Sequence, residues 1–239
     1  MKKQTRTSEG LKRTCGIAVF AALAFLVTLV IRIPVQFLTF DVKDAIICLA
    51  AFMYGPISGV IIALIAAFIE LVTISGTGFY GFLMNFISSA AFAFTASFIY
   101  SRRKTLGGAI IGVYSAAAVL TAVMMGLNLI ITPLYMGVER SVVASMLPTL
   151  LLPFNLAKAL LNSAITLLLY KPLVIALRRA HLLPTPIAAP ADSDSPKIKE
   201  ESRGSFSHNR FSKKTYIPII LGVCTAVVSI VVFIILNRA

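Results

Sequence analysis

One stretch of the sequence decides the fold class: residues 44–74 read DAIICLAAFMYGPISGVIIALIAAFIELVTI. The stretch is apolar almost throughout, and its only charged residues are Asp44 and Glu70. It is too long for one ordinary membrane span, which takes ~20 residues. The Gly55-Pro56 pair inside it is a strong helix breaker. We therefore predict two short membrane helices joined by a tight turn at this pair.

Similar apolar runs lie on both sides of this stretch. Each is long enough to cross the membrane once, and they cover about 15–35, 82–100, 106–135, 147–177 and 217–236. The first run follows basic residues, as a secretory signal does, but it is long for a signal, so we interpret it as a retained helix. The chain is 58% hydrophobic and 13% charged, against about 45–50% and about 25% in soluble proteins.

These runs predict an all-α integral membrane protein, with a six-helix bundle and an additional C-terminal transmembrane helix. Residues 1–14 form a basic N-terminus, and residues 15–180 form the six-helix membrane domain. In residues 181–215, Pro, Ser and charged residues dominate and the apolar periodicity disappears, which is typical of a flexible linker. Residues 216–239 contain the additional helix.

The basic residues indicate the orientation in the cell membrane. The formal net charge is +13, and basic clusters stand at the N-terminus, at 102–104 and at 178–179. All three fall on one side of the predicted topology, which the positive-inside rule makes cytoplasmic. The loops at 36–43, 75–81 and 139–146 then lie outside. The same charges can contact acidic lipids, and since no soluble basic face exists, we expect no nucleic-acid binding.

The sequence lacks the motifs that several kinds of chemistry require. The three cysteines lack metal-ligand or redox spacing, and the two histidines lie outside the apolar runs. There is no Gly-x-x-x-x-Gly-Lys-Ser/Thr loop for ATP hydrolysis. We therefore expect no enzyme activity, metal site or cofactor, and a transporter made of this chain would need an ion gradient or an energising partner.

Lys158 is the most informative polar residue, because it lies inside an apolar run. An ionised side chain at the centre of a membrane helix costs ~2.5–3.5 kcal/mol, and such residues are usually functional. The alternative is that Lys158 extends its ammonium group to an interface. Asn155, Lys158 and Asn162 have the spacing of one helix face, so Lys158 has polar neighbours.

Other amides lie at a similar predicted depth. Asn85 and Asn128 fall in the outer half of their spans, as Asn155 and Lys158 do, with Thr39 just above them. This arrangement favours an outward-facing pocket, although single asparagines can also join helices for ~0.6–2 kcal/mol each. Amides, one lysine and aromatic rings suit a neutral, planar ligand with many acceptors; the nearby rings are Phe40, Tyr80, Phe82 and Phe154.

Two further features have alternative interpretations. Ala18 and Ala22 give the first helix a small-xxx-small face, which either packs inside the bundle or receives a partner. Glu70 could couple transport to protons, but it stands near the outer end of its span, so we expect a solvated anchor.

Several motifs resemble the S components of energy-coupling factor (ECF) vitamin transporters. The segments LTFDVKD (38–44) and FMYGPISG (52–59) resemble the first loop and second helix of that family, and GFLMNF (81–86) resembles the start of its fourth helix. The segments GLN (126–128), TPLY (132–135) and LPFNLAK (152–158) are similar to its riboflavin-specific branch. The resemblance covers residues 11–180, and Lys43 and Ala45 depart from the pattern.

The resemblance implies a six-helix subunit that captures riboflavin from outside and docks on a membrane-embedded coupling (T) subunit with two ATPase subunits. Leu38 and Thr39 would then cap the ligand, and the Ala18/Ala22 face would dock the partner. The residues around the flavin would be Asn85, Asn128, Asn155 and Lys158. The alternatives are an S component for another vitamin, an autonomous proton-coupled transporter using Glu70, and a membrane anchor that recruits a partner through the additional helix.

Overall fold

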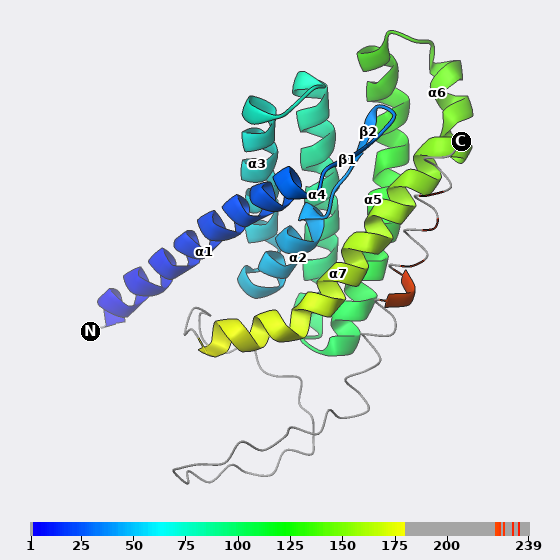
Figure 1. Cartoon of the computed structure of the whole chain (residues 1–239). Helices are drawn as coiled ribbons and strands as arrows, with labels where there is room; N and C mark the ends of the chain where they lie inside the picture. The colour runs from blue at the N-terminus through cyan, green and yellow to red at the C-terminus, as the bar shows by residue number, and fades with distance from the viewer. Residues whose placement is uncertain (1, 180–222, 226, 228–230, 232–233, 235–239) are drawn as a thin grey trace.

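The computed structural model describes residues 2–179, together with 223–225, 227, 231 and 234 (Figure 1). The predicted linker, 181–215, lies outside the described residues, as does most of the predicted additional helix. The division of the chain into four parts therefore stays a prediction.

The described chain is helical apart from one hairpin. In order, its elements are α1 (Lys2–Val30), β1 (Ile33–Val35), β2 (Leu38–Phe40), α2 (Lys43–Tyr54), α3 (Pro56–Thr73), α4 (Gly78–Arg102), α5 (Leu106–Met136), α6 (Arg140–Met146), the π-helical turn η1 (Leu147–Leu151) and α7 (Leu152–Arg179). The segment 139–146, which we predicted as a loop, is mostly helix, because α6, η1 and α7 follow one another without a break.

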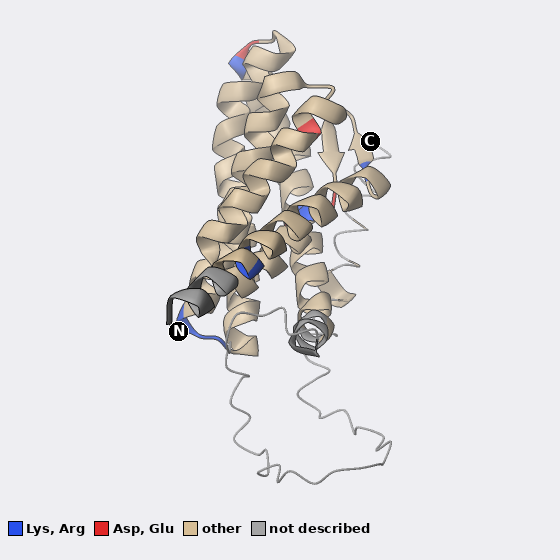
Figure 2. Ribbon diagram, turned by 90° about the vertical axis from the view of Figure 1, so that its left-hand side faces the viewer, with Lys and Arg blue, Asp and Glu red and all other residues tan. Residues whose placement is uncertain are grey.

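Five helical stretches of the described chain are long and apolar enough to cross a membrane. They are Gly10–Val30, Pro56–Thr73, Gly78–Arg102, Leu106–Met136 and Arg140–Tyr170. Lys, Arg, Asp and Glu residues are sparse along these helices (Figure 2). This supports the predicted helical membrane fold. The helix α2 has only 12 residues, so the predicted count of six spans plus one stays a prediction.

The predicted break in the stretch 44–74 is present between α2 and α3. Gly55 has a φ of 95°, which a glycine adopts without steric cost, and Pro56 begins α3, where its missing N–H is not needed. The side chain of Arg13 donates to the Tyr54 carbonyl at 2.9 Å and to Ser58 Oγ at 2.7 Å. These bonds join the first helix to the turn.

The first helix is shorter at its outer end than we predicted. It ends at Val30, and residues 33–40 form an antiparallel hairpin that pairs Ile33 with Phe40 and Val35 with Leu38. A residue before proline avoids the helical conformation, so Pro34 keeps Ile33 extended. Gln36, in the two-residue turn, has a φ of 51°, as hairpin turns of this length require.

The helix α2 is the centre of the bundle. Every residue of α2 except Ile46 is buried, and α2 packs against α1, α3, α4 and α7 (Figure 1). The hairpin packs on α7 through a small apolar cluster formed by Val35, Phe40, Phe154 and Ala157. The hairpin is therefore fixed against the bundle where Asn155 and Lys158 lie.

Candidate functional site

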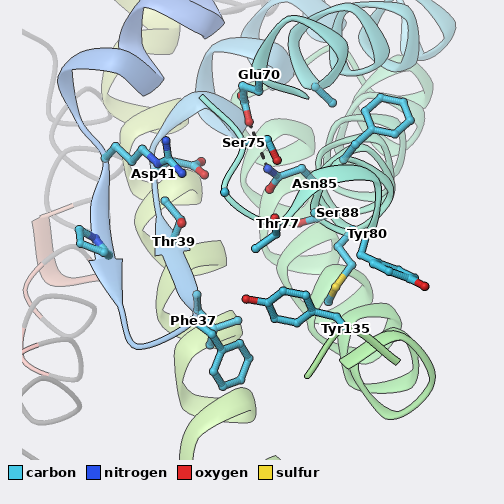
Figure 3. Close-up of a pocket in the computed structure, with 18 of the residues that line it drawn as sticks. Phe37, Thr39, Asp41, Glu70, Ser75, Thr77, Tyr80, Asn85, Ser88 and Tyr135 are labelled. Carbon is cyan, nitrogen blue, oxygen red and sulfur yellow. Dashed lines mark hydrogen bonds between the residues drawn. The ribbon is translucent and has the colours of Figure 1, made fainter. Parts of the chain in front are cut away.

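A cavity of about 360 Å³ lies between the hairpin and the helices α3, α4, α5 and α7. Thr39 and Asp41 face it from the hairpin side, opposite Glu70, Asn85 and Ser88 (Figure 3). All six residues that we predicted to bind a ligand line this one cavity: Leu38, Thr39, Asn85, Asn128, Asn155 and Lys158. The structure thus brings together residues from four separate segments, and their role as ligand contacts stays a prediction.

The cavity wall changes from polar and buried to aromatic and exposed. Asn128, Asn155 and Lys158 are buried. At the rim, Tyr80 is 42% exposed and Tyr135 is 38% exposed. Of the four aromatic residues named from the sequence, three line the cavity, and Phe40 packs behind the wall, 5.9 Å from the ring of Phe154.

Two asparagines of the wall, Asn128 and Asn155, do not join helices to one another, whereas Asn85 of α4 donates to Glu70 of α3. Asn128 Nδ2 donates to the Met124 carbonyl of its own helix at 2.7 Å, and Asn128 Oδ1 accepts from Thr132 at 2.9 Å. Asn155 likewise donates to the Leu151 carbonyl at 2.8 Å. These bonds hold the two amides in place within α5 and α7.

Asn162, about two turns beyond Asn155 in α7, also joins elements. Its Nδ2 donates to the backbone carbonyl of Asp41 at 3.1 Å, and its Oδ1 accepts from the backbone N–H of Ala45 at 2.8 Å. Asn162 therefore fixes the segment between β2 and α2, which carries Asp41.

A chain of buried ion pairs runs along the cavity. Lys158 Nζ lies 2.9 Å from Asp41 Oδ2, and Lys43 Nζ lies 3.9 Å from the same oxygen. Lys43 also lies 2.6 Å and 2.7 Å from the two Glu70 oxygens, and Asn85 donates to Glu70 at 3.1 Å. Burial would raise the pKa of the Asp41 carboxyl, but the charges of Lys158 and Lys43 outweigh burial and hold that pKa below its usual value.

This chain of ion pairs rules out one alternative and corrects one expectation drawn from the sequence. Lys158 does not extend to an interface, because it is 5% exposed and paired with Asp41. Glu70 is not a solvated anchor, because it is 5% exposed and paired with Lys43. Lys43, which departs from the family pattern, is thus the buried partner of Glu70, and a buried pair of this kind is costly to break.

Sequence reasoning missed Asp41 and Lys43 as residues of the site. Both stand in the segment quoted for the resemblance, but a charge beside an apolar run usually indicates a solvated loop. One signal in the sequence could have found Asp41. A lysine inside a membrane helix needs an acidic partner, and the outer segments contain acidic residues.

The small residues of α1 divide between two faces. Ala21 and Ala24 are buried in an apolar cluster with α2 and α3. Ala18 and Ala22 are exposed. The Ala18/Ala22 face therefore lies outside the described bundle and is open to lipid or a partner.

Comparisons with known proteins agree with this architecture. The family model described as ECF transporter, substrate-specific component matches residues 12–174. The chain is similar to the riboflavin transporter RibU of Staphylococcus aureus (strain TCH60), with 33% identity over 70% of this chain and 93% of the relative. It is also similar to the riboflavin transporter FmnP of Bacillus subtilis (strain 168), with 22% identity over 72% of this chain and 98% of the relative.

A solved structure supports the same grouping. The S component of a bacterial ECF transporter superimposes with a TM-score of 0.62 and 30% identity, over 71% of this chain and 99% of that chain. Together with the apolar helices, these matches make the chain a multi-pass membrane protein. The chain belongs to the family of substrate-specific components of ECF transporters, and it is a transport protein rather than an enzyme.

Proposed function

We propose that this chain is the riboflavin-binding S component of an ECF-type, ATP-driven vitamin importer in the cell membrane. The two relatives named above are both called riboflavin transporters, and this chain matches 93% and 98% of their lengths. One observation carries the proposal. The wall of a single cavity contains Asn85, Asn128, Asn155 and Lys158.

The cavity suits a flavin in size and chemistry. Its volume of about 360 Å³ is within the range of small-molecule sites, about 300–1,000 Å³. A flavin has a planar ring with several carbonyl and ring-nitrogen acceptors, and amides and an ammonium group supply donors for them. The aromatic side chains Tyr80, Phe82 and Phe154 on the same wall can pack against a planar ring.

The charge distribution supports capture from the outer side. The helix α4 begins at Gly78, near the cavity residue Asn85, and ends at Arg102. The exposed cluster at 102–104 stands at the other end of that helix and favours the cytoplasm. The cavity then opens outward, and the N-terminus is cytoplasmic.

The proposed energy source is a partner. The sequence has no nucleotide-binding loop, so ATP hydrolysis belongs to two ATPase subunits joined through a coupling (T) subunit. The exposed Ala18/Ala22 face of α1 would let a helix of the T subunit approach closely. In this proposal residues 181–215 link the bundle to the additional helix.

A titration of the purified full chain with riboflavin tests the proposal. We expect saturable binding at micromolar ligand or below, measured by calorimetry and by the change in flavin fluorescence. Thiamine serves as the control vitamin. Binding of thiamine in place of riboflavin would favour an S component for another vitamin. Uptake without any ATPase partner would favour a proton-coupled transporter.

A further inference from the structure

We infer that Asp41 is a further ligand-binding residue, and that its Oδ1 accepts a hydrogen bond from the imide N–H of the flavin ring. Lys158, the partner of Asp41, donates to a carbonyl next to that N–H. This inference rests on the proposed function and names the group of the ligand that this part of the cavity recognises.

The geometry of Asp41 leaves one acceptor available. Asp41 lines the cavity and is 1% exposed. Its Oδ2 is taken by Lys158 at 2.9 Å, with Lys43 at 3.9 Å. Its Oδ1 has no hydrogen-bond partner among the described residues. A buried acceptor without a partner is costly, and more so when it is charged, so a donor on the ligand would stabilise this oxygen.

Two other buried carboxylates do not present a free oxygen on the cavity wall. Glu70 also lines the cavity, but Lys43 binds both of its oxygens and Asn85 donates to it as well. Asp44 accepts a hydrogen bond from Ser89, and its Oδ2 also lacks a partner among the described residues. However, Asp44 does not line the cavity. Asp41 alone of the three combines a free oxygen with a place on the cavity wall.

The chemistry of the ligand selects the imide over the hydroxyl groups. A flavin carries an imide N–H between two carbonyl groups, and an imide N–H is a stronger donor than an alcohol. Hydrogen bonds to an ionised acceptor are about twice as strong as neutral ones. Lys158 and Asp41 stand side by side and present a donor next to an acceptor, which matches the alternation of carbonyl and N–H along the imide.

A ligand that lacks this donor tests the inference. The purified full chain, Asp41→Asn and the matched control Asp44→Asn are each titrated with riboflavin and with N3-methylriboflavin. We expect the wild type and Asp44→Asn to bind the methylated ligand at least about tenfold more weakly, since a site built to bind a donor rejects a ligand without it. In Asp41→Asn, Lys158 holds the amide oxygen and the NH2 group faces the ligand, so the difference between the two ligands should fall below about threefold.

The outcomes separate this inference from the proposed function. Equal binding of the two ligands by the wild type, or an unchanged difference in Asp41→Asn, overturns the role of Asp41 while riboflavin binding stands. No binding of riboflavin by the wild type removes the proposed function and the inference together. If Asp41→Asn does not fold, Asp41→Glu replaces it, because it keeps the charge for Lys158 but moves the free oxygen, and the same narrowing is expected.

Discussion

At the scale of single residues, the buried charges explain how Lys158 can stand inside an apolar helix. An isolated ammonium group there would be costly, but Asp41 lies 2.9 Å away. The carboxylate comes from the segment between the hairpin and α2, so the same pair also fixes the chain that covers the cavity. One contact therefore serves both the fold and the proposed site.

Replacement of this lysine should weaken ligand binding. Lys158→Met removes the ammonium donor from the wall and leaves Asp41 without its closest cation, so riboflavin should bind at least about tenfold more weakly. Calorimetric titration measures the change. Lys104→Met, which alters an exposed lysine at the other end of α4, is the control and should bind normally. An unchanged affinity in Lys158→Met would mean that the ligand binds elsewhere.

The pair between Lys43 and Glu70 should matter for stability. Lys43→Met leaves Glu70 as a buried carboxylate without its cation, which we expect to cost about 3–5 kcal/mol of unfolding free energy. The double variant Lys43→Met/Glu70→Gln removes the charge as well and should recover most of that loss. Thermal unfolding in detergent compares the two. A double variant as unstable as Lys43→Met would show that charge is not the cause.

At the scale of elements, the contact between α4 and α5 depends on one glycine. A Cβ at Gly112 would lie 2.7 Å from the Ala96 carbonyl oxygen, whereas a Cβ at Gly126, in the same helix, meets nothing within 4 Å. Gly112→Ala should therefore destabilise the protein by about 1–3 kcal/mol. The control Gly126→Ala should be neutral or stabilising, since alanine favours helix. Equal melting temperatures of the two variants would contradict this packing.

Much of the helical framework could be predicted, because a membrane helix is recognised by the length of its apolar run. The break at Gly55-Pro56 could be predicted for a similar local reason. The hairpin could not, because strands of three residues are too short to give an alternating pattern. The helix α1 therefore appeared to continue to Val35.

The residues of the candidate site could be predicted only in part. Asn128, Asn155 and Lys158 stand out because a polar residue is unusual within an apolar run. Asp41 and Lys43 stand in a segment that the sequence predicts to be a loop, where charges are common. Their burial depends on Asn162 and Glu70, which come from distant segments, and no pattern within the loop indicates such pairs.

At the scale of the whole molecule, the proposed ligand site and the proposed docking face lie on different surfaces. The cavity lies among the hairpin and helices α3, α4, α5 and α7, and the Ala18/Ala22 face lies on the outside of α1. Ala18→Leu/Ala22→Leu should therefore leave riboflavin affinity unchanged and abolish ATP-dependent uptake with the partner subunits, because larger side chains keep another helix away. The control is Val30→Leu, at an exposed position of the same helix. Normal uptake in the double variant would place the docking surface elsewhere.

The C-terminal part of the chain should be dispensable for ligand binding. Within the described part of the chain, the residues that line the cavity all lie between Thr28 and Lys158. A chain that ends at residue 183 should therefore bind riboflavin as the full chain does. Comparison of uptake by the two chains then tells whether residues 184–239 serve transport. Loss of binding in the shorter chain would contradict the placement of the site.

The π-helical turn Leu147–Leu151 gives α7 an unusual tolerance to a change in chain length. A π turn closes its backbone hydrogen bonds one residue further along than an α turn, so it holds one residue more. The deletion of one residue here could be absorbed by closing the turn as α-helix, and Asn155 and Lys158 would still face the cavity. A deletion at Leu160 would instead rotate the two halves of α7 by about 100° relative to each other. Length variation in this helix is therefore expected only in the turn that precedes the ligand wall.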